Sequence, residues 1–225
     1  MTLVAIARNP SSEADVTVAR PWRRPDAQSL QTYLVYAGLT ALLFVAGYGG
    51  ANWLATQRET HFRLYWDVEL SVPLVPQAIW IYLSINLLFL LPLFRLDRHE
   101  MVWLGRRMIA ATLIASACFL ILPTTIGFAR LDDGSNPAFS LLYALDYPFN
   151  CAPSLHVAYS ALIIAAIWRG AVRGLRLPLA AWLVMIIAST ILTHQHHLID
   201  AVSALLLVGM LCRIGRDRPV QEAKP

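Results

Sequence analysis

The hydrophobic positions of this chain are gathered in long blocks, and polar segments separate each block from the next. A helix that crosses a membrane needs about 20 consecutive, mostly apolar residues, and most of the blocks approach that length. The blocks predict six helical spans, at residues 31–55, 73–94, 108–128, 155–171, 177–194 and 198–214. The pattern therefore favours an all-α integral membrane protein built as a bundle of six transmembrane helices.

The segments between the predicted spans are too short to form a soluble domain. We therefore expect one membrane domain at 31–214, with a cytoplasmic tail at 1–30 and another at 215–225. The first tail contains several prolines and mixed charge, which is typical of a disordered segment. It holds no apolar stretch like the core of a signal peptide, so the first span is expected to serve as an uncleaved signal.

The composition supports a membrane protein. Hydrophobic residues make up 57% of the chain and charged residues 14%, a balance that soluble domains rarely show. The net charge is +4 and the pI is near 9.2, but the basic residues are not clustered in one segment, so we expect no nucleic-acid partner. Arginine greatly outnumbers lysine, which indicates GC-rich coding and hence a protein of a bacterial inner membrane.

The basic residues follow the positive-inside pattern of membrane proteins. They concentrate in the two tails and near 95–107 and 169–176, whereas the loops at 56–72, 129–154 and 195–197 contain few of them. Loops on the cytoplasmic side carry an excess of Lys and Arg. The sequence therefore predicts that both termini face the cytoplasm and that the three poorly basic loops face the exterior.

Ionisable residues gather at the outer ends of the predicted spans, and such residues at membrane depth tend to mark functional sites. Three segments contribute them: Arg130 follows the third span, His156 opens the fourth, and the stretch STILTHQHHLIDAV (189–202) holds His194, His196, His197 and Asp200. These segments are far apart in the sequence but lie at one predicted depth. We therefore expect a single site that opens toward the exterior.

The stretch HQHHLID (194–200) places a carboxylate near a histidine if it is helical. His196 and Asp200 are four residues apart and would share a helix face. A carboxylate that accepts from one imidazole nitrogen fixes the tautomer and raises the basicity of the other nitrogen, which then becomes a credible nucleophile or base. His197 is three residues from Asp200 and could compete for the same role, whereas His194 would point elsewhere.

The stretch NCAPSLHVAY (150–159) leads from a polar loop into the fourth span. Pro153 interrupts the loop, and Ser154 is a preferred residue type for capping the helix that follows. The start of a helix presents unpaired backbone N–H groups and a partial positive charge, which together attract anions. Because His156 lies in the first turn, the sequence predicts a phosphate-binding helix start with a proton donor beside it.

Other interpretations of these residues stay open at this point. The three histidines near 195 also fit an interfacial loop that is merely polar. Zinc would need three or four converging ligands, which His156, His196 and Asp200 could supply, and two histidines on different spans could ligate a haem. We favour a site without a metal or other cofactor.

Two of these stretches resemble signatures of the type 2 phosphatidic acid phosphatase (PAP2) superfamily. PSLH (153–156) is similar to its Pro-Ser-Gly-His signature, and STILTHQHHLID (189–200) is similar to Ser-Arg, five residues, His, three residues, Asp. Leu155 within CAPSLH, and DVELSVPLVPQAIWIYLS (67–84), look more like the branch that includes inositol phosphorylceramide synthases. The resemblance covers nearly all of 31–214 and implies a six-span fold with an outward site.

Besides Leu155, the chain departs from the family pattern at three positions. The first family signature is Lys, six residues, Arg-Pro, and its best match is PTTIGFARL (123–131), in which Arg130 matches the arginine. Pro123 occupies the lysine position and Leu131 replaces the proline. Thr190 stands where the third signature has its arginine. Two usual cations are therefore missing, and a protonated His194 is the candidate to replace part of their charge.

The resemblance implies roles for five residues. His196 would attack phosphorus, Asp200 would orient it, and His156 would protonate the leaving alcohol. Arg130, Ser154 and the backbone N–H groups of 154–156 would bind the phosphate. The implied function is a membrane lipid-phosphate phosphatase with a phosphohistidine intermediate, whose partners are its lipid phosphate substrate and membrane lipids. Transfer of a phospho-headgroup to a lipid alcohol, and a non-catalytic lipid-binding or transport protein, are the alternatives.

Overall fold

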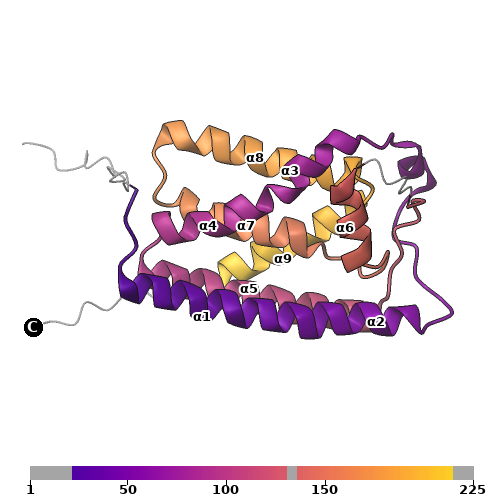
Figure 1. Ribbon diagram of the computed structural model, residues 1–225, viewed down its shortest axis with the longest axis horizontal. Coiled ribbons are helices and arrows are strands. Elements are labelled where there is room, and N and C mark those ends of the chain that lie inside the picture. Colours follow the sequence, from indigo (N-terminus) through magenta and orange to yellow (C-terminus); the bar gives the residue numbers. More distant parts are fainter. Residues whose placement is uncertain (1–21, 131–135, 215–225) are drawn as a thin grey trace, which may run out of the picture.

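A bundle of helices makes up the computed structural model, which describes residues 22–130 and 136–214 (Figure 1). Its first part is one long rod formed by α1 (Ala27–Leu43), a π-helical turn η1 (Phe44–Gly49) and α2 (Gly50–Thr56). The other helices are η2 (Asp67–Ser71), η3 (Pro76–Ala78), α3 (Ile79–Leu83), α4 (Ile85–Arg95), α5 (Arg98–Ile121), α6 (Pro137–Leu145), α7 (Leu155–Trp168), α8 (Arg173–Leu192) and α9 (Leu198–Arg213). The described residues contain two isolated β-bridges and no β-strand.

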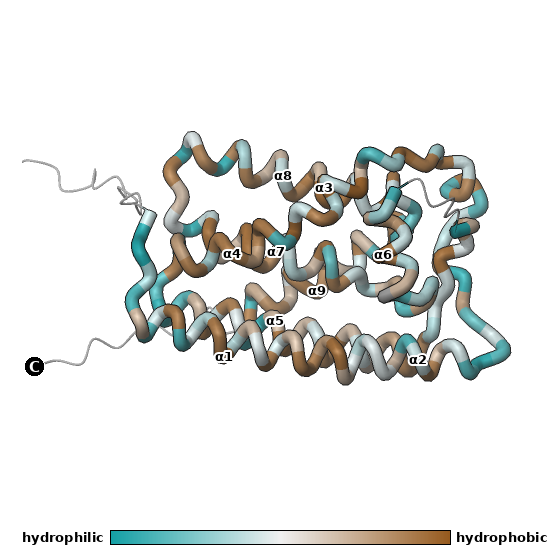
Figure 2. The backbone as a smooth tube through the Cα atoms, in the orientation of Figure 1, coloured by the Kyte–Doolittle hydropathy of each residue, from teal (hydrophilic) through white to brown (hydrophobic). Residues whose placement is uncertain are grey.

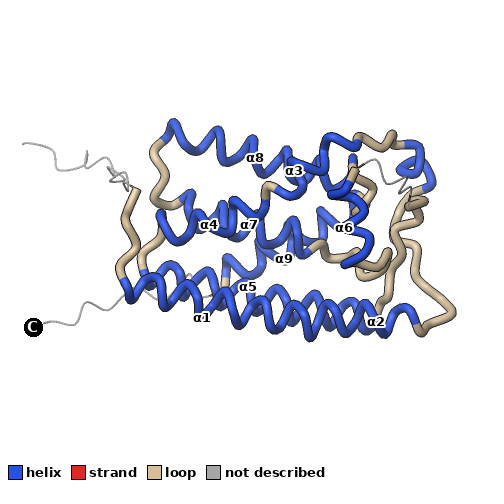
Figure 3. Tube along the Cα trace, viewed as in Figure 1, coloured by secondary structure: helices blue, strands red, loops and turns tan. Residues whose placement is uncertain are grey.

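The long helices run side by side, and the longest loops gather at one end of the bundle (Figures 1 and 3). This end, which we call the loop end, carries residues 57–75, 122–130 and 136–154, the last of which include α6. At the opposite end, the backbone N–H of Arg23 donates to the carbonyl of Phe94, and the guanidinium of Arg107 donates to the carbonyls of Leu211 and Ile214. Both ends of the described chain therefore lie away from the loop end.

Helix α7 lies at the centre of the bundle. It packs against α4, α5, α8 and α9, and almost all of its side chains are buried, from Leu155 to Ile167. A helix that is apolar on every face is the kind that a protein core buries. Because α7 is enclosed by four other helices, the residues of its first turn are held in fixed positions at the loop end.

Four helices are long and apolar enough to cross a membrane, in the part of the chain that the structure describes. They are Ala27–Thr56, Pro76–Arg95, Arg98–Ile121 and Arg173–Leu192, and their apolar segments are visible between more polar ends (Figure 2). Helices α7 and α9 have 14 and 16 residues, which at 1.5 Å per residue is about 21 and 24 Å. The membrane-type helical fold is confirmed, whereas six spans and cytoplasmic termini stay predictions.

The third predicted span is displaced from its expected position. It was expected at 108–128, but α5 runs from Arg98 to Ile121. Asp97 starts the helix early, because its carboxylate accepts from the Glu100 N–H and the Glu100 carboxylate accepts from the Asp97 N–H. Arg107 lies within the helix, with its guanidinium 3.9 Å from the ring of Trp103. The arginines therefore do not mark the start of this helix.

The contact between α1 and α5 depends on a glycine. A Cβ added at Gly105 would lie 2.3 Å from the ring of Tyr36. We therefore expect Gly105→Ala to lower the midpoint of thermal unfolding in detergent, because such overpacking costs about 1–3 kcal/mol. Gly38→Ala on α1, where the new Cβ meets nothing within 4 Å, is the control and should unfold at or above the wild-type midpoint. An unchanged midpoint for Gly105→Ala would contradict this packing.

Candidate active site

The first turn of α7 is fixed by Ser154, as the sequence predicted. The hydroxyl of Ser154 accepts from the backbone N–H of Val157 at 3.3 Å, which caps the helix. The backbone N–H of Ser154 donates to the carbonyl of Asp200 at 3.1 Å. Ser154 is fully buried. Its hydroxyl caps α7 and its N–H binds Asp200 in the first turn of α9, so Ser154 joins the starts of the two helices.

Asp200 holds the start of α9 and orients His196. Its Oδ2 accepts from the backbone N–H of His197 at 2.8 Å and lies 3.2 Å from Nδ1 of His196. The predicted contact between His196 and Asp200 is therefore present. The helix begins only at Leu198, however, so His196 precedes the helix instead of sharing its face. With Nδ1–H directed at a carboxylate, the other ring nitrogen of His196 is the one left for chemistry.

The neighbouring histidines are held by other groups. The ring of His197 lies between those of Tyr65 and Phe128, its Nε2 donates to the carbonyl of Ile126, and its Nδ1 lies 3.3 Å from Oε2 of Glu69. His194 stacks on Phe128 and its Nε2 donates to a loop carbonyl, that of Val72. The side chain of His197 thus does not compete for Asp200, and His194 is directed at a backbone carbonyl.

Glu69 joins the first long loop to α9, and the sequence analysis did not identify it. Its carboxylate accepts from the backbone N–H groups of Leu198 at 2.9 Å and Trp66 at 3.0 Å and faces His197. Burial disfavours the charged form, but these N–H groups and His197 outweigh it and hold the pKa of Glu69 below its usual value. A lone acidic residue in a polar loop gives no signal of this role.

His156 lies in the first turn of α7 with an unused nitrogen. Its ring stacks on that of Tyr82, with the centroids 3.9 Å apart. Its Nε2 is buried and has no hydrogen-bond partner among the described residues. A buried polar atom without a partner is unusual and calls for an explanation. A bound substrate group is one that could supply the partner.

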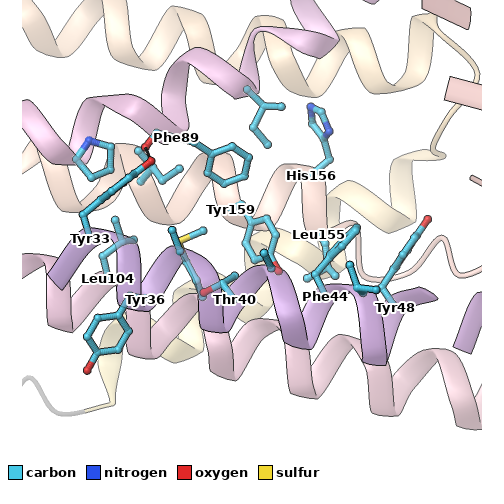
Figure 4. A pocket seen from close by; sticks show the side chains of 18 of the residues that line it. Tyr33, Tyr36, Thr40, Phe44, Tyr48, Phe89, Leu104, Leu155, His156 and Tyr159 are labelled. Atoms are coloured by element: carbon cyan, nitrogen blue, oxygen red, sulfur yellow. Dashed lines mark hydrogen bonds between the residues drawn. The ribbon is translucent and has the colours of Figure 1, made fainter. Parts of the chain in front are cut away.

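A cavity of about 440 Å³ brings His156 and His196 together. Both side chains line it, together with Tyr48, Tyr82 and Asp146 (Figure 4 shows His156 and Tyr48). The expected juxtaposition of His156 and His196 in one cavity is therefore present. Asp200 lies behind His196, and Ser154 is buried as a helix cap.

Arg130 does not line this cavity but contacts Asp146, which does. Its guanidinium donates through Nη1 to the backbone carbonyl of Asp146 and lies 4.9 Å from the ring centre of Tyr143. Within the described residues, the Nε of Arg130 is buried without a partner. The arginine is thus next to a residue that lines the cavity, but a direct phosphate contact by Arg130 stays a prediction.

Asp146 is the feature of the cavity that the sequence analysis missed. Its Oδ1 accepts from the hydroxyl of Tyr48 and from Nδ2 of Asn52, each at 2.7 Å. Burial raises the pKa of Asp146, although Tyr48, Arg130 and Asn52 partly oppose the shift. An acidic residue in a long loop is usually solvated, and only its position eight residues before Ser154 hinted at a role.

The two positions that lack the family cations are occupied by structural residues. The carbonyl of Pro123 accepts from the backbone N–H of Phe62 at 2.8 Å. Thr190 is fully buried, and its hydroxyl donates to the carbonyl of Ile187 at 2.8 Å. No group of three His, Cys, Asp or Glu side chains converges as metal ligands in the described ranges, so the zinc set considered from the sequence does not form there.

Comparison with protein families connects this geometry to a known group. A model of the PAP2 superfamily matches residues 72–214, which include both cavity histidines and Asp200. The chain belongs to the PAP2 superfamily. Searches of curated proteins and of solved structures each gave no match. PAP2 superfamily members are typically phosphatases or phosphotransferases, and the likeness to the inositol phosphorylceramide synthase branch stays a resemblance.

The contacts of Glu69 predict how stability depends on pH. A carboxylate whose pKa is lowered in the folded protein stabilises it above its usual pKa of 4.5, and this contribution is lost as the pH falls through the lower folded value. We expect Glu69→Gln to unfold at a lower temperature than wild type at pH 7, with the difference shrinking on acidification below about pH 4.5.

Thermal unfolding in detergent between pH 3 and pH 7, about the range that the carboxylate titration covers, measures this effect. Glu59→Gln, at an exposed position of the same loop, is the matched control and should follow the wild-type curve. A difference between Glu69→Gln and wild type that does not depend on pH would show that packing, and not charge, is what the glutamate contributes.

Proposed function

We propose that the protein is a membrane lipid-phosphate phosphatase that forms a phosphohistidine on His196, at the outer face of the membrane. The observation that carries the proposal is one cavity lined by two histidines, one held in the orientation of a nucleophile and the other with a ring nitrogen available for proton transfer. Asp200 occupies Nδ1 of His196, which leaves its second nitrogen as a nucleophile, and the buried Nε2 of His156 has no partner among the described residues. Membership of the PAP2 superfamily supports the same reaction class.

In the first half of the reaction, Nε2 of His196 attacks phosphorus and the bond from phosphorus to the alcohol oxygen breaks. A new N–P bond forms, and protonated His156 gives its Nε2 proton to the departing oxygen, so a lipid alcohol leaves. Asp200 keeps the Nδ1 proton of His196 in place and stabilises the positive ring that results. General acid catalysis of this kind contributes about 10²–10⁴-fold.

In the second half, His156 removes a proton from water as the water oxygen attacks phosphorus. The N–P bond breaks, inorganic phosphate leaves, and both histidines return to their starting forms. His156 thus acts as an acid in the first half and as a base in the second, because the same ring nitrogen faces the leaving oxygen and then the attacking one. If an alcohol takes the place of water, the same steps produce transfer in place of hydrolysis.

The groups that would bind the phosphate oxygens are fewer than the sequence suggested. The backbone N–H of Ser154 already donates to Asp200 and the Ser154 hydroxyl already caps α7. This leaves the N–H groups of Leu155 and His156, which open the helix and have no partner within it, together with Arg130. Stabilisation of charge on phosphate is the main task in phosphoryl transfer, so we expect a modest turnover rate.

One observation favours transfer as the second candidate. Asp146 adds a carboxylate to the cavity, and its negative charge opposes a doubly charged phosphate monoester more than a singly charged diester. A diester donor leaves a phosphorylated headgroup on His196, and an alcohol acceptor could donate its proton toward Asp146. Incubation with a diester lipid and a lipid alcohol distinguishes the two candidates by product, because transfer yields a new phospholipid and hydrolysis does not.

The test of the proposed function is phosphate release from a lipid phosphate in detergent, with a chelator present. We expect His196→Ala to abolish release and His156→Ala to lower kcat about 10²–10⁴-fold. His99→Ala, at an exposed position on α5, is the control and should retain wild-type activity. Brief incubation with labelled substrate should trap an acid-labile phosphoryl group on wild type and none on His196→Ala.

Two results would contradict the proposal. If a variant with both His156→Ala and His196→Ala still released phosphate at the wild-type rate, the cavity histidines would not be catalytic. If wild type bound lipid phosphates but released no phosphate and formed no new lipid, a lipid-binding or transport role would replace the enzyme.

A further inference from the structure

The cavity that contains the histidines continues far along the rod formed by η1 and α1. From Tyr48 its lining follows the helix through Phe44, Ala41 and Ala37 to Tyr33. Figure 4 shows Tyr48, Phe44, Thr40, Tyr36 and Tyr33 in sequence along this helix, with His156 near the Tyr48 end. Fifteen residues at 1.5 Å each give a length of about 22 Å. The catalytic groups thus occupy one end of a long, narrow space.

The wall of this space is almost entirely apolar away from the histidines. α4 contributes Ile85, Phe89 and Pro92, and α5 contributes Met101, Leu104 and Met108. The Tyr33 hydroxyl donates to the carbonyl of Phe89 at 3.1 Å, so its polar atom is satisfied and joins the walls at the far end. Thr40 adds one hydroxyl midway. Such a lining suits a hydrocarbon and does not suit a sugar or a peptide.

The volume matches one chain and not two. A cavity of about 150 Å³ accommodates benzene, which is about 25 Å³ for each carbon. At that ratio, 440 Å³ holds about 18 carbons, the size of a single long chain. A lipid with two chains of this size would need about twice the volume.

The side of the cavity along α1 is open. Ala37, Ala41 and Val45 line it and are also exposed, and they belong to a helix long and apolar enough to cross a membrane. A chain could therefore enter from the bilayer without leaving an apolar environment. Since lipid tails are as apolar as the wall, transfer from bilayer to cavity adds little affinity. What the cavity provides is a fixed position and room for one chain.

We propose that this cavity holds the single hydrocarbon chain of the substrate, so that the enzyme selects single-chain lipid phosphates over diacyl lipid phosphates. This inference rests on the proposed function, because the phosphate of the bound lipid then lies at His156 and His196. A chain that fills the cavity fixes the depth of the phosphate relative to both histidines. Fixed geometry of this kind acts mainly on the rate of the chemical step.

The substrate test compares octyl phosphate, hexadecyl phosphate and dihexadecanoyl phosphatidate in the same detergent. Wild type should have the highest kcat/KM for hexadecyl phosphate, and the diacyl lipid should fall at least about tenfold below it, as expected for a ligand that overfills a packed site. Farnesyl phosphate, also a single chain, should be used in preference to the diacyl lipid as well.

The cavity test narrows the space at its midpoint. Ala41→Phe should lower the ratio of kcat/KM for hexadecyl phosphate to that for octyl phosphate about tenfold, because a short chain ends before the new ring and a long one does not. Ala46→Phe is the matched control and should leave the ratio unchanged. Ala46 is exposed in η1, which belongs to the same rod as α1, and its side chain does not line the cavity. Thermal unfolding of both variants checks that the fold is intact.

A binding measurement separates failure of this inference from failure of the proposed function. Hexadecyl phosphate should bind the His196→Ala variant in native mass spectrometry, and Ala41→Phe in that background should weaken the binding. Equal use of single-chain and diacyl lipids by wild type, or an unchanged ratio in Ala41→Phe, would overturn the chain site while leaving the phosphatase intact. Binding that Ala41→Phe weakens, without hydrolysis by wild type, would retain the chain site and reject the phosphatase.

Discussion

The arrangement of the candidate active site depends on the hydrogen bonds of one residue. Asp200 uses its carboxylate for the His197 N–H and for Nδ1 of His196, and its carbonyl accepts from the Ser154 N–H. The start of α7, the start of α9 and the ring of His196 are therefore tied to a single buried point. In the proposed enzyme, a carboxylate that both caps a helix and orients a histidine would couple catalysis to stability, so activity lost on substitution at Asp200 must be compared with the stability of the same variant.

Two opposite electrostatic features meet at this site. The unpaired N–H groups at the start of α7 and the guanidinium of Arg130 favour an anion, whereas Asp146 places a partly buried carboxylate on the cavity wall. The hydrogen bonds that the Asp146 carboxylate accepts from the Tyr48 hydroxyl and from Nδ2 of Asn52 reduce this conflict, because they offset part of its charge. In the proposed reaction, the balance between these groups, and not the histidine pair alone, would determine which phosphate charge the site accepts.

Much of this arrangement follows from sequence, and the remainder depends on tertiary contacts. Local rules were enough for the Ser154 cap and for four helices of spanning length. The contact between His196 and Asp200 is present, but the shared helix face from which it was predicted is not, because α9 begins at Leu198. The start of α5 was misplaced because the capping box at Asp97 outweighed the arginines on the helix. Asp146 and Glu69 were missed because an acidic residue in a loop has no periodic pattern, and only distant partners reveal its burial.

The position of α1 has an evolutionary consequence. The region that matches the family is 72–214, which contains the histidines and the enclosed helix α7, whereas α1 precedes it and has few buried residues. A change in a core helix disturbs many neighbours, but a change on an exposed wall alters little beyond the space it borders. If the proposed chain site is correct, substitutions on the exposed side of α1 would change which lipids fit without displacing the two histidines, so lipid preference could change independently of the reaction.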